Sequence, residues 1–333
     1  MDQDCERLSE LSDLITPMAI RVAATLRLAD RIAAGTTTVP ELAAALDADP
    51  DALGRLLRYL AARGVFAESA PGRFVLTGPA QPLRDDHPEQ IRAWLDLTGP
   101  IGRADLAFGA LLDVVRTGKP GYPMRYRRDF WADLAGDAQL SASFGALMAA
   151  GAARWAPWLA AQDWSGVRHV ADVGGGTGVL LGALLRAHPH LRGTLVETSA
   201  TAAAAERALA EVGLAQRCDV VAGSFFDPLP AGADVYLLSS IVHDWNDADA
   251  TVILRRCVQA GGRGSRVLLR ELVAGGDQDQ QTVTQTDLRM LVYLGGRERT
   301  REDFAALAAA AGLTITSVTA IEGAYSLIDC TVR

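Results

Sequence analysis

The sequence has almost no lysine and no excess of positive charge. Lys119 is its only lysine, and its formal net charge is −8 at pH 7. Proteins that bind nucleic acids or anionic membrane surfaces do so through clustered Lys and Arg side chains. The composition therefore argues against both kinds of partner.

Cysteine is also scarce, and a long apolar run is missing. The four cysteines, at positions 5, 218, 257 and 330, are far apart and show neither CxxC pairs nor the Cys/His spacing of a metal site. We expect them to be reduced thiols. No run approaches the ~20 apolar residues that span a bilayer, and residues 1–4 are acidic where a signal peptide is basic. These features predict a cytoplasmic protein.

The sequence also lacks one glycine of the dinucleotide-binding pattern. Residues 170–178 read V-A-D-V-G-G-G-T-G, an apolar strand that ends in an acid and a glycine cluster. Such glycines let the backbone approach a ligand, and the next helix points its first N–H groups at the same place. The dinucleotide fingerprint G-x-G-x-x-G fails because Val179 or Leu181 stands where its third glycine belongs. No Lys-Ser/Thr pair of a P-loop follows. The pattern favours a nucleotide-like cofactor without a pyrophosphate, such as S-adenosylmethionine.

The first part of the chain has helical patterning. At 333 residues the chain is long enough for two domains. Within residues 1–100, a capping box of Thr38 and Glu41 begins one helix, and a second helix follows at about 51–63. Pro71-Gly72 is the expected turn of a short hairpin. Two helices and a hairpin predict a winged helix.

Winged helices often read DNA, so the charge of this region matters. Residues 1–100 carry 10 Arg and no Lys against 15 Asp and Glu, a net charge of about −5. A DNA reader needs a basic face. We therefore expect this domain to mediate self-association, with a second subunit covering apolar helices such as the one predicted at 14–28. A ligand-sensing DNA-binding regulator is the alternative.

Residues 101–165 continue as helices and are rich in aromatic side chains. Most of these are expected to pack between helices. Others are candidates for lining a flat, apolar substrate pocket, in which methionine is an adaptable contact. The predicted substrate-contacting residues from this region and from further along the chain are Trp131, Phe144, Met148, Asp244, Met290 and Tyr293. We interpret 101–165 as a helical linker and substrate-pocket region.

From 166 to 333, strands alternate with helices, which indicates a parallel α/β sheet. We expect strands at about 168–173, 193–197, 218–222, 234–239, 265–272, 313–320 and 325–331. Only a few residues around Glu322-Gly323 join the last two, so these strands are expected to be antiparallel neighbours. The predicted fold is a Rossmann-like α/β domain with one antiparallel terminal strand, preceded by a mostly helical winged-helix domain.

Polar and aromatic residues follow the carboxyl ends of these strands, where open α/β sheets bind ligands. Glu197 stands 19 residues after Gly178, where an acid can accept hydrogen bonds from ribose hydroxyls. That spacing also suits NAD, and only the glycine pattern separates the two cofactors. Phe225 is placed to cover an adenine ring. The predicted cofactor-binding residues are Asp172, Gly174, Gly176, Glu197, Ser224, Phe225, Ser239 and Trp245.

Four motifs occur in order: D-V-G-G-G-T-G, G-S-F-F-D-P-L-P, I-V-H-D-W-N-D and G-G-R-E-R-T-R-E-D-F. They resemble the caffeate/hydroxyindole-type O-methyltransferase family, which includes many tailoring enzymes of bacterial aromatic polyketide pathways. The resemblance covers nearly the whole chain. It implies a winged-helix dimerisation domain, a homodimer, S-adenosylmethionine as cofactor and no metal. Ser224 and Ser239 depart from plant members, which have an acid and a lysine there.

The resemblance implies that His243 is the catalytic base and that Glu271 and Glu298 flank it. A phenol must lose its proton as its oxygen attacks the sulfonium methyl group, and imidazole is a suitable acceptor near neutral pH. Carboxylates fix the ring's tautomer and stabilise the imidazolium that forms. The acids at 244–249 suit a hard cation, but we expect them to cap and charge the next helix.

These observations predict an S-adenosylmethionine-dependent O-methyltransferase that acts on a hydroxylated aromatic natural product. Two enzyme alternatives stay open. One is a relative diverted to S-adenosylmethionine-assisted hydroxylation or decarboxylation, and the other is an N- or C-methyltransferase.

Overall fold

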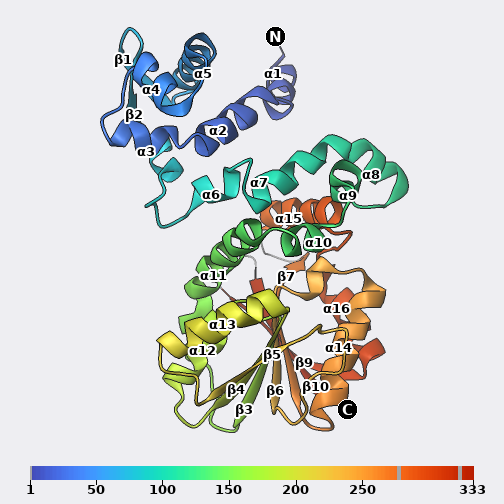
Figure 1. The fold of residues 1–333 in the computed structure, drawn as a ribbon. Coiled ribbons are helices and arrows are strands. Elements are labelled where there is room, and N and C mark those ends of the chain that lie inside the picture. Colours follow the sequence, from blue (N-terminus) through green and yellow to red (C-terminus); the bar gives the residue numbers. More distant parts are fainter. Residues whose placement is uncertain (1, 276–278, 322–324) are drawn as a thin grey trace. The chain divides into compact units, whose positions relative to one another are not determined.

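The computed structural model describes residues 2–275, 279–321 and 325–333. The chain forms two compact units that meet in sequence between Leu106 and Ala107 (Figure 1). Helix α7, Pro100–Asp105, therefore belongs to the first unit. The turn predicted at Glu322-Gly323 lies outside the described residues.

The first unit is mostly helical. Its elements are α1 (Gln3–Leu11), α2 (Ile15–Thr25), α3 (Leu28–Ala33), α4 (Val39–Leu46), α5 (Pro50–Ala62), β1 (Phe66–Ala70), β2 (Arg73–Leu76), η1 (Gly78–Leu83), α6 (Ile91–Leu95) and α7. Strands β1 and β2 pair antiparallel. The helix predicted at 14–28 is shorter than expected, because Arg27 takes a left-handed conformation (φ 52°) that ends α2 and allows α3 to start in a new direction.

Apolar periodicity explains how the winged helix packs. The capping box of Thr38 and Glu41 is present at the start of α4, as the sequence predicts. On α5, Leu53, Leu57 and Leu60 fall on one face and are buried. They pack in the core with residues of α3, α4 and the hairpin, including a fully buried Phe74.

The second unit begins with helices that precede its sheet. These are η2 (Leu106–Ala110), α8 (Leu111–Thr117), α9 (Gly121–Tyr126), α10 (Phe130–Ala135) and the 23-residue α11 (Ala138–Ala160). Phe130 lies at the centre of an aromatic cluster, with ring centroids 5.1 Å from Trp131, 5.6 Å from Phe144 and 6.4 Å from Tyr293.

The sheet confirms the predicted α/β topology. Its strands are β3 (His169–Val173), β4 (Arg192–Glu197), β5 (Cys218–Ala222), β6 (Val235–Ser239), β7 (Arg266–Ala274), β8 (Arg299–Thr300), β9 (Leu313–Ala320) and β10 (Tyr325–Val332). The spatial order is β5-β4-β3-β6-β7-β10-β9, and β8 pairs with β7. Strand β10 is antiparallel to both β7 and β9. The order reverses between β3 and β6, which is where ligands bind in open α/β sheets.

Helices cover both faces of this sheet (Figure 1). Helix α11 packs on one face with α12 (Val179–Ala187) and α13 (Ser199–Glu211), in a core that includes Leu184 and Leu209. On the other face, α14 (Asp247–Gly261) and α16 (Arg301–Ala311) pack around Ile253 and Phe304. The remaining elements of this unit are η3 (Val242–Asp244) and α15 (Gln280–Tyr293).

The cysteines are free thiols, as expected from their spacing. All four cysteines are free, and three of them are buried. Among the described residues, no helix has the length and apolarity that a membrane span requires.

Candidate active site

The glycine turn joins β3 to α12 at the point where the strand order reverses. A Cβ atom on Gly175 would lie 2.5 Å from the carboxyl group of Asp172, and one on Gly174 would lie 2.6 Å from Cδ1 of Ile241. Gly176 has φ +58° and meets nothing within 4 Å. Gly174 and Gly175 let the chain pass close to its neighbours, and Gly176 leaves open space beside the start of α12.

Asp172 presents an unpaired carboxyl group at this turn. It is fully buried, and neither oxygen has a hydrogen-bond partner among the described residues. Burial, together with the nearby charge of Glu197, raises the pKa of Asp172 to about 7. A buried polar group without a partner is costly, so the turn is suited to a ligand that donates hydrogen bonds or carries positive charge.

Glu197 lies beside the same turn, at the end of β4. Its Oε1 accepts from the N–H of Gly176 at 3.3 Å, and its Oε2 accepts from the N–H of Thr198 at 2.7 Å. Burial raises the pKa of Glu197. The structure thus brings the two acids of the predicted cofactor site to one glycine turn.

Aromatic residues flank the turn on the β6 side. The space above Gly174 is bounded by Ile241 and by the ring of Phe225, whose Cε1 lies 3.6 Å from the added Cβ. Phe225 packs edge-on against Trp245 at 5.8 Å. The buried Nε1 of Trp245 has no hydrogen-bond partner among the described residues. Phe225 therefore lies beside the glycine turn, and Trp245 packs against it.

The predicted cofactor set contains two serines, Ser224 and Ser239. Each lies at or just after the carboxyl end of a strand, β5 for Ser224 and β6 for Ser239. Ser224 Oγ accepts from the N–H of Phe226 at 3.2 Å and so shapes the turn after β5. Ser239 ends β6, in register with Arg270 of β7.

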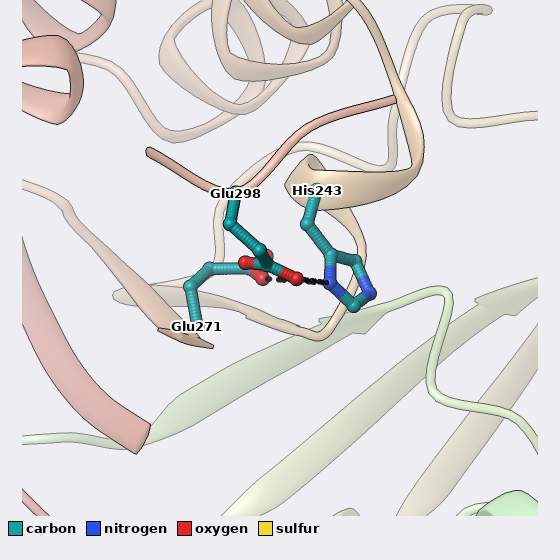
Figure 2. A group of neighbouring side chains, drawn as sticks. All are labelled: His243, Glu271 and Glu298. Carbon is teal, nitrogen blue, oxygen red and sulfur yellow. Dashed lines mark hydrogen bonds and ion pairs between the residues drawn. The ribbon is translucent and has the colours of Figure 1, made fainter. Parts of the chain in front are cut away.

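His243 lies in the short η3 turn after β6 and is buried. Its Nδ1 is 2.7 Å from Oε1 of Glu298 (Figure 2). Because a carboxylate can only accept, Nδ1 carries the proton of this bond and Nε2 is the basic nitrogen. In Figure 2, Nε2 points away from both glutamates. The pair therefore has the geometry of an oriented general base.

Glu271 holds the loop that carries this histidine. Its Oε1 accepts from the N–H groups of Ile241 at 3.1 Å and Val242 at 2.8 Å. Its Oε2 lies 4.0 Å from Nδ1 of His243 and has no hydrogen-bond partner in the described part of the chain. The two glutamates are thus unequal, since Glu298 bonds the ring and Glu271 bonds the backbone while adding negative charge nearby.

The charges around His243 control its protonation. Burial by itself lowers the pKa of the imidazole, but the carboxylates of Asp244, Glu271 and Glu298 together raise it well above the ordinary value. Asp244 Oδ1 lies 3.4 Å from Nε2. Burial raises the pKa of Asp244 to about 7, against the lowering effect of His243. The site therefore binds a proton readily and stabilises an imidazolium.

The predicted substrate residues gather near the segment that carries Glu298. Trp131, Phe144 and Tyr293 contact one another through Phe130, which the sequence analysis did not single out although it precedes Trp131 directly. Met148 lies one helical turn after Phe144 on α11, and Met290 lies one turn before Tyr293 on α15.

Family models match both units of the chain. An O-methyltransferase domain matches residues 108–314, and an O-methyltransferase dimerisation domain matches residues 9–83. The chain belongs to the O-methyltransferase family.

Relatives of this family member act on aromatic natural products. It is 50% identical over 309 residues to the 2,7-dihydroxy-5-methyl-1-naphthoate 7-O-methyltransferase of Streptomyces carzinostaticus, with 92% of each chain covered. It is also 50% identical over 328 residues to the aclacinomycin 10-hydroxylase RdmB of Streptomyces purpurascens, with 95% of this chain and 86% of that protein covered.

A solved relative has bound ligands. The crystal structure of the O-methyltransferase NcsB1 from neocarzinostatin biosynthesis, in complex with S-adenosylmethionine and 2-hydroxy-5-methyl naphthoic acid, superposes with a TM-score of 0.92 at 48% identity. The match covers 97% of this chain and 98% of that chain.

Within this O-methyltransferase, two clusters of acids bear on a possible metal site. His243, Glu271 and Glu298 offer ligand atoms within 4.8 Å of one another, but hydrogen bonds already engage Nδ1 of His243 and one oxygen of each glutamate, which favours acid–base chemistry. In the other cluster, Asn246 caps α14 by accepting from the N–H of Asp249 at 3.0 Å. The acidic run is a helix start, as the sequence predicts.

Gly296 is where the Glu298 segment passes closest to the loop of His243. A Cβ there would lie 2.1 Å from the carbonyl oxygen of His243, and the N–H of Arg297 donates to that oxygen at 2.9 Å. Gly296→Ala is expected to lower the free energy of unfolding by about 1–3 kcal/mol and to lower turnover, because the displaced carbonyl belongs to His243, the predicted base. Thermal unfolding and kcat measure both effects. Gly151→Ala in α11, which meets nothing within 4 Å, is the matched control and should retain turnover; equal kcat in the two variants would contradict the prediction.

Proposed function

We propose that the protein transfers the methyl group of S-adenosylmethionine to a hydroxyl group of an aromatic natural product, with His243 as general base. The observation that carries this proposal is the buried bond of 2.7 Å between Nδ1 of His243 and Glu298, which leaves Nε2 to accept a proton. When bound, the cofactor supplies an electrophilic methyl group on a sulfonium.

The residues around His243 have distinct parts in this mechanism. Nε2 takes the hydroxyl proton as the substrate oxygen attacks, and Glu298 fixes the tautomer that makes this possible. The imidazolium that forms is stabilised by the negative charge of Glu298 and Glu271. Asp244, 3.4 Å from Nε2, is the group that meets the substrate beside the base. Burial of all four side chains keeps water away, which favours a reaction that removes separated charge.

The glycine turn is the proposed cofactor site. Asp172 lies buried beneath the turn, and we propose that its unpartnered carboxylate attracts the cationic part of S-adenosylmethionine by its charge across the turn. Glu197 is proposed to bind the ribose hydroxyls, and the open space at Gly176 admits the ligand next to the N-terminus of α12. The remaining proposed contacts are Gly174, Ser224, Phe225, Ser239 and Trp245.

The acceptor is proposed to be flat and apolar. Helices α10, α11 and α15 carry the aromatic cluster around Phe130, and we propose residues 101–165 as the region that shapes the substrate pocket. Trp131, Phe144, Met148, Met290 and Tyr293 are the proposed contacts. The naphthoate methyltransferase named above suggests hydroxynaphthoic acids as the first compounds to test.

Incubation of the purified protein with a panel of hydroxynaphthoic acids and methyl-labelled S-adenosylmethionine tests the proposal. Formation of S-adenosylhomocysteine with a product heavier by one CH2 group and labelled on oxygen supports O-methylation. A product heavier by one oxygen atom identifies the hydroxylase chemistry of the RdmB type and overturns the proposal, and so does label on nitrogen or carbon.

We further propose that the protein is a homodimer formed through its N-terminal unit. That unit matches the dimerisation domain of the family. Its first two helices expose large apolar side chains, Leu8, Leu11, Leu14 and Ile15, each at least 66% exposed in the single chain. Patches of this kind mark interaction surfaces. A monomer by light scattering would contradict this proposal, while a cytoplasmic location and the absence of a nucleic-acid partner remain predictions from composition.

A further inference from the structure

Arg299 is a buried cation that the proposed mechanism does not use. It lies in β8, directly after Glu298, and is 1% exposed, the largest of the fully buried side chains among the described residues. Its Nη1 donates to the carbonyl of Val242 at 2.9 Å, and its Nη2 donates to that of Trp245 at 2.8 Å. Its Nε donates to Oδ1 of Asp247 at 2.9 Å.

These bonds bracket the catalytic histidine. Val242 precedes His243, and Trp245 follows two residues after it, so one guanidinium holds both ends of the η3 turn. Successive side chains of an extended segment point in opposite directions. Arg299 can therefore donate hydrogen bonds to the backbone of the turn while its neighbour Glu298 accepts one from the ring of His243.

The burial of the Arg299 guanidinium carries a free-energy cost, which indicates a role beyond packing. Burying a cation is expensive unless it is paired and hydrogen-bonded. The anion that pairs with Arg299 is Asp247, whose side chain is 60% exposed. An apolar side chain could fill the space of Arg299 without the cost of burying a charge. The planar guanidinium, in contrast, presents several N–H groups in a fixed fork and defines the spacing of the oxygens that it binds.

We propose that Arg299 is a positioning residue for the proposed reaction: its guanidinium sets the register between the segment that carries Glu298 and the turn that carries His243. Arg299 acts through these two residues and contacts neither substrate nor cofactor. Small misplacements of reacting groups are costly in rate. The inference rests on the proposed function, because it assigns Arg299 to the alignment of that base.

Arg299→Met, which keeps the length of the chain but not the donors, tests the proposal. We expect kcat to fall about 10–100-fold, with a much smaller loss of affinity for S-adenosylhomocysteine, because the proposed cofactor residues Asp172 and Glu197 lie at another turn and Arg299 bonds the backbone of Trp245 alone among the proposed contacts. Arg299→Lys is expected to lower kcat as well, since an ammonium group does not reproduce the fork. A loss of cofactor affinity equal to the loss of kcat would overturn the proposal.

A double-mutant cycle with Glu298→Gln separates positioning from general stability. If Arg299 acts by aligning Glu298 with His243, then Arg299→Met costs little more once Glu298 has been replaced. Losses of kcat that multiply in the double variant would show that Arg299 acts elsewhere and would overturn the proposal.

Titration of His243 gives a readout that does not depend on turnover. The chain has five histidines, and His243→Gln assigns the relevant NMR signal. In Arg299→Lys, which keeps the positive charge but not the fork, we expect a lower pKa for His243, because its bond to Glu298 is no longer aligned. An unchanged pKa overturns the positioning role. If the wild-type protein methylates no phenol, the proposed function fails while this comparison still decides the role of Arg299.

Asp247→Ala keeps the proposal falsifiable if Arg299→Met does not fold. This exposed side chain anchors the guanidinium from outside, so its loss is expected to lower kcat several-fold. Asp249→Ala is the matched control: it removes an acid from the same first turn of α14, bonded to Asn246 and not to Arg299. Equal turnover in wild type, Asp247→Ala and Arg299→Lys would overturn the proposal.

Discussion

His243→Ala is expected to lower turnover by at least about 10²-fold, the usual contribution of a positioned general base. Affinity for S-adenosylhomocysteine should stay within the range of the wild-type protein, because the glycine turn and Glu197 do not depend on the imidazole. Steady-state kinetics with an identified acceptor measure the first quantity, and calorimetry measures the second.

His190→Ala is a matched control for this variant. His190 is an exposed residue whose ring bonds the carbonyl of Trp164 at 3.1 Å, so the variant removes an imidazole away from the site. Turnover in His190→Ala should remain near that of the wild type. Full activity in His243→Ala would remove the proposed base and with it the mechanism.

The pH dependence of turnover follows from the same residue. An imidazole accepts a proton only in its neutral form, which predominates above its pKa. Since the pKa of His243 is raised well above its ordinary value of 6.5, turnover should rise with pH beyond neutrality before it levels. Glu298→Gln removes one of the charges that raise this pKa. The rising limb should therefore move to lower pH in that variant, while maximal turnover falls because the ring loses its orientation; a limb at the same pH would contradict the assignment.

The sheet and the glycine turn could be predicted from sequence because their signals are local. Each main strand is a short apolar run, and β7 was misjudged only at its end, which extends to Ala274. Strand β8 was missed because two residues give no periodicity. The continuous helix predicted at 14–28 was wrong because Arg27 breaks it with a left-handed backbone, and no residue type in that stretch announces such a break.

The chemistry at the site was predictable only in part. His243, Glu271 and Glu298 came from the resemblance to a family, and the structure brings all three within 4.8 Å. Their division of labour could not be inferred, since it depends on the backbone N–H groups that face Glu271 after folding. Arg299 was not predicted as a site residue. Arginine is almost never fully buried, so the sequence alone indicates a surface position for it.

Asp172→Asn is expected to weaken the binding of S-adenosylmethionine by about 10–100-fold at pH 8, because the neutral amide removes a buried negative charge that attracts the cationic ligand where water does not screen it. The effect depends on the protonation of the Asp172 carboxyl group before and after the cofactor binds. Its pKa is raised to about 7 by burial and by Glu197, and a cationic ligand favours the ionised form. Binding should therefore release a proton near and below neutral pH.

The sign of the pH effect follows from that release. Below about pH 7 the carboxyl group must first lose its proton, which opposes binding, so the affinity of the wild-type protein should rise as pH increases toward 8. Asparagine does not titrate at this position, so the variant should bind weakly with little dependence on pH. Calorimetry in buffers with different ionisation enthalpies counts the protons released.

The same carboxyl group should destabilise the protein when no cofactor is bound. The folded pKa of Asp172 lies above its ordinary value of 3.8, so folding becomes less favourable as pH rises from that value to about 7, and the penalty persists above it. At pH 8, Asp172→Asn should therefore unfold at a temperature no lower than the wild type while binding the cofactor less tightly. Asp219→Asn, on the exposed side of β5, should change neither property. Tight, pH-dependent cofactor binding in Asp172→Asn would show that another group receives the positive charge, and lower stability without cofactor would show that Asp172 is a structural residue.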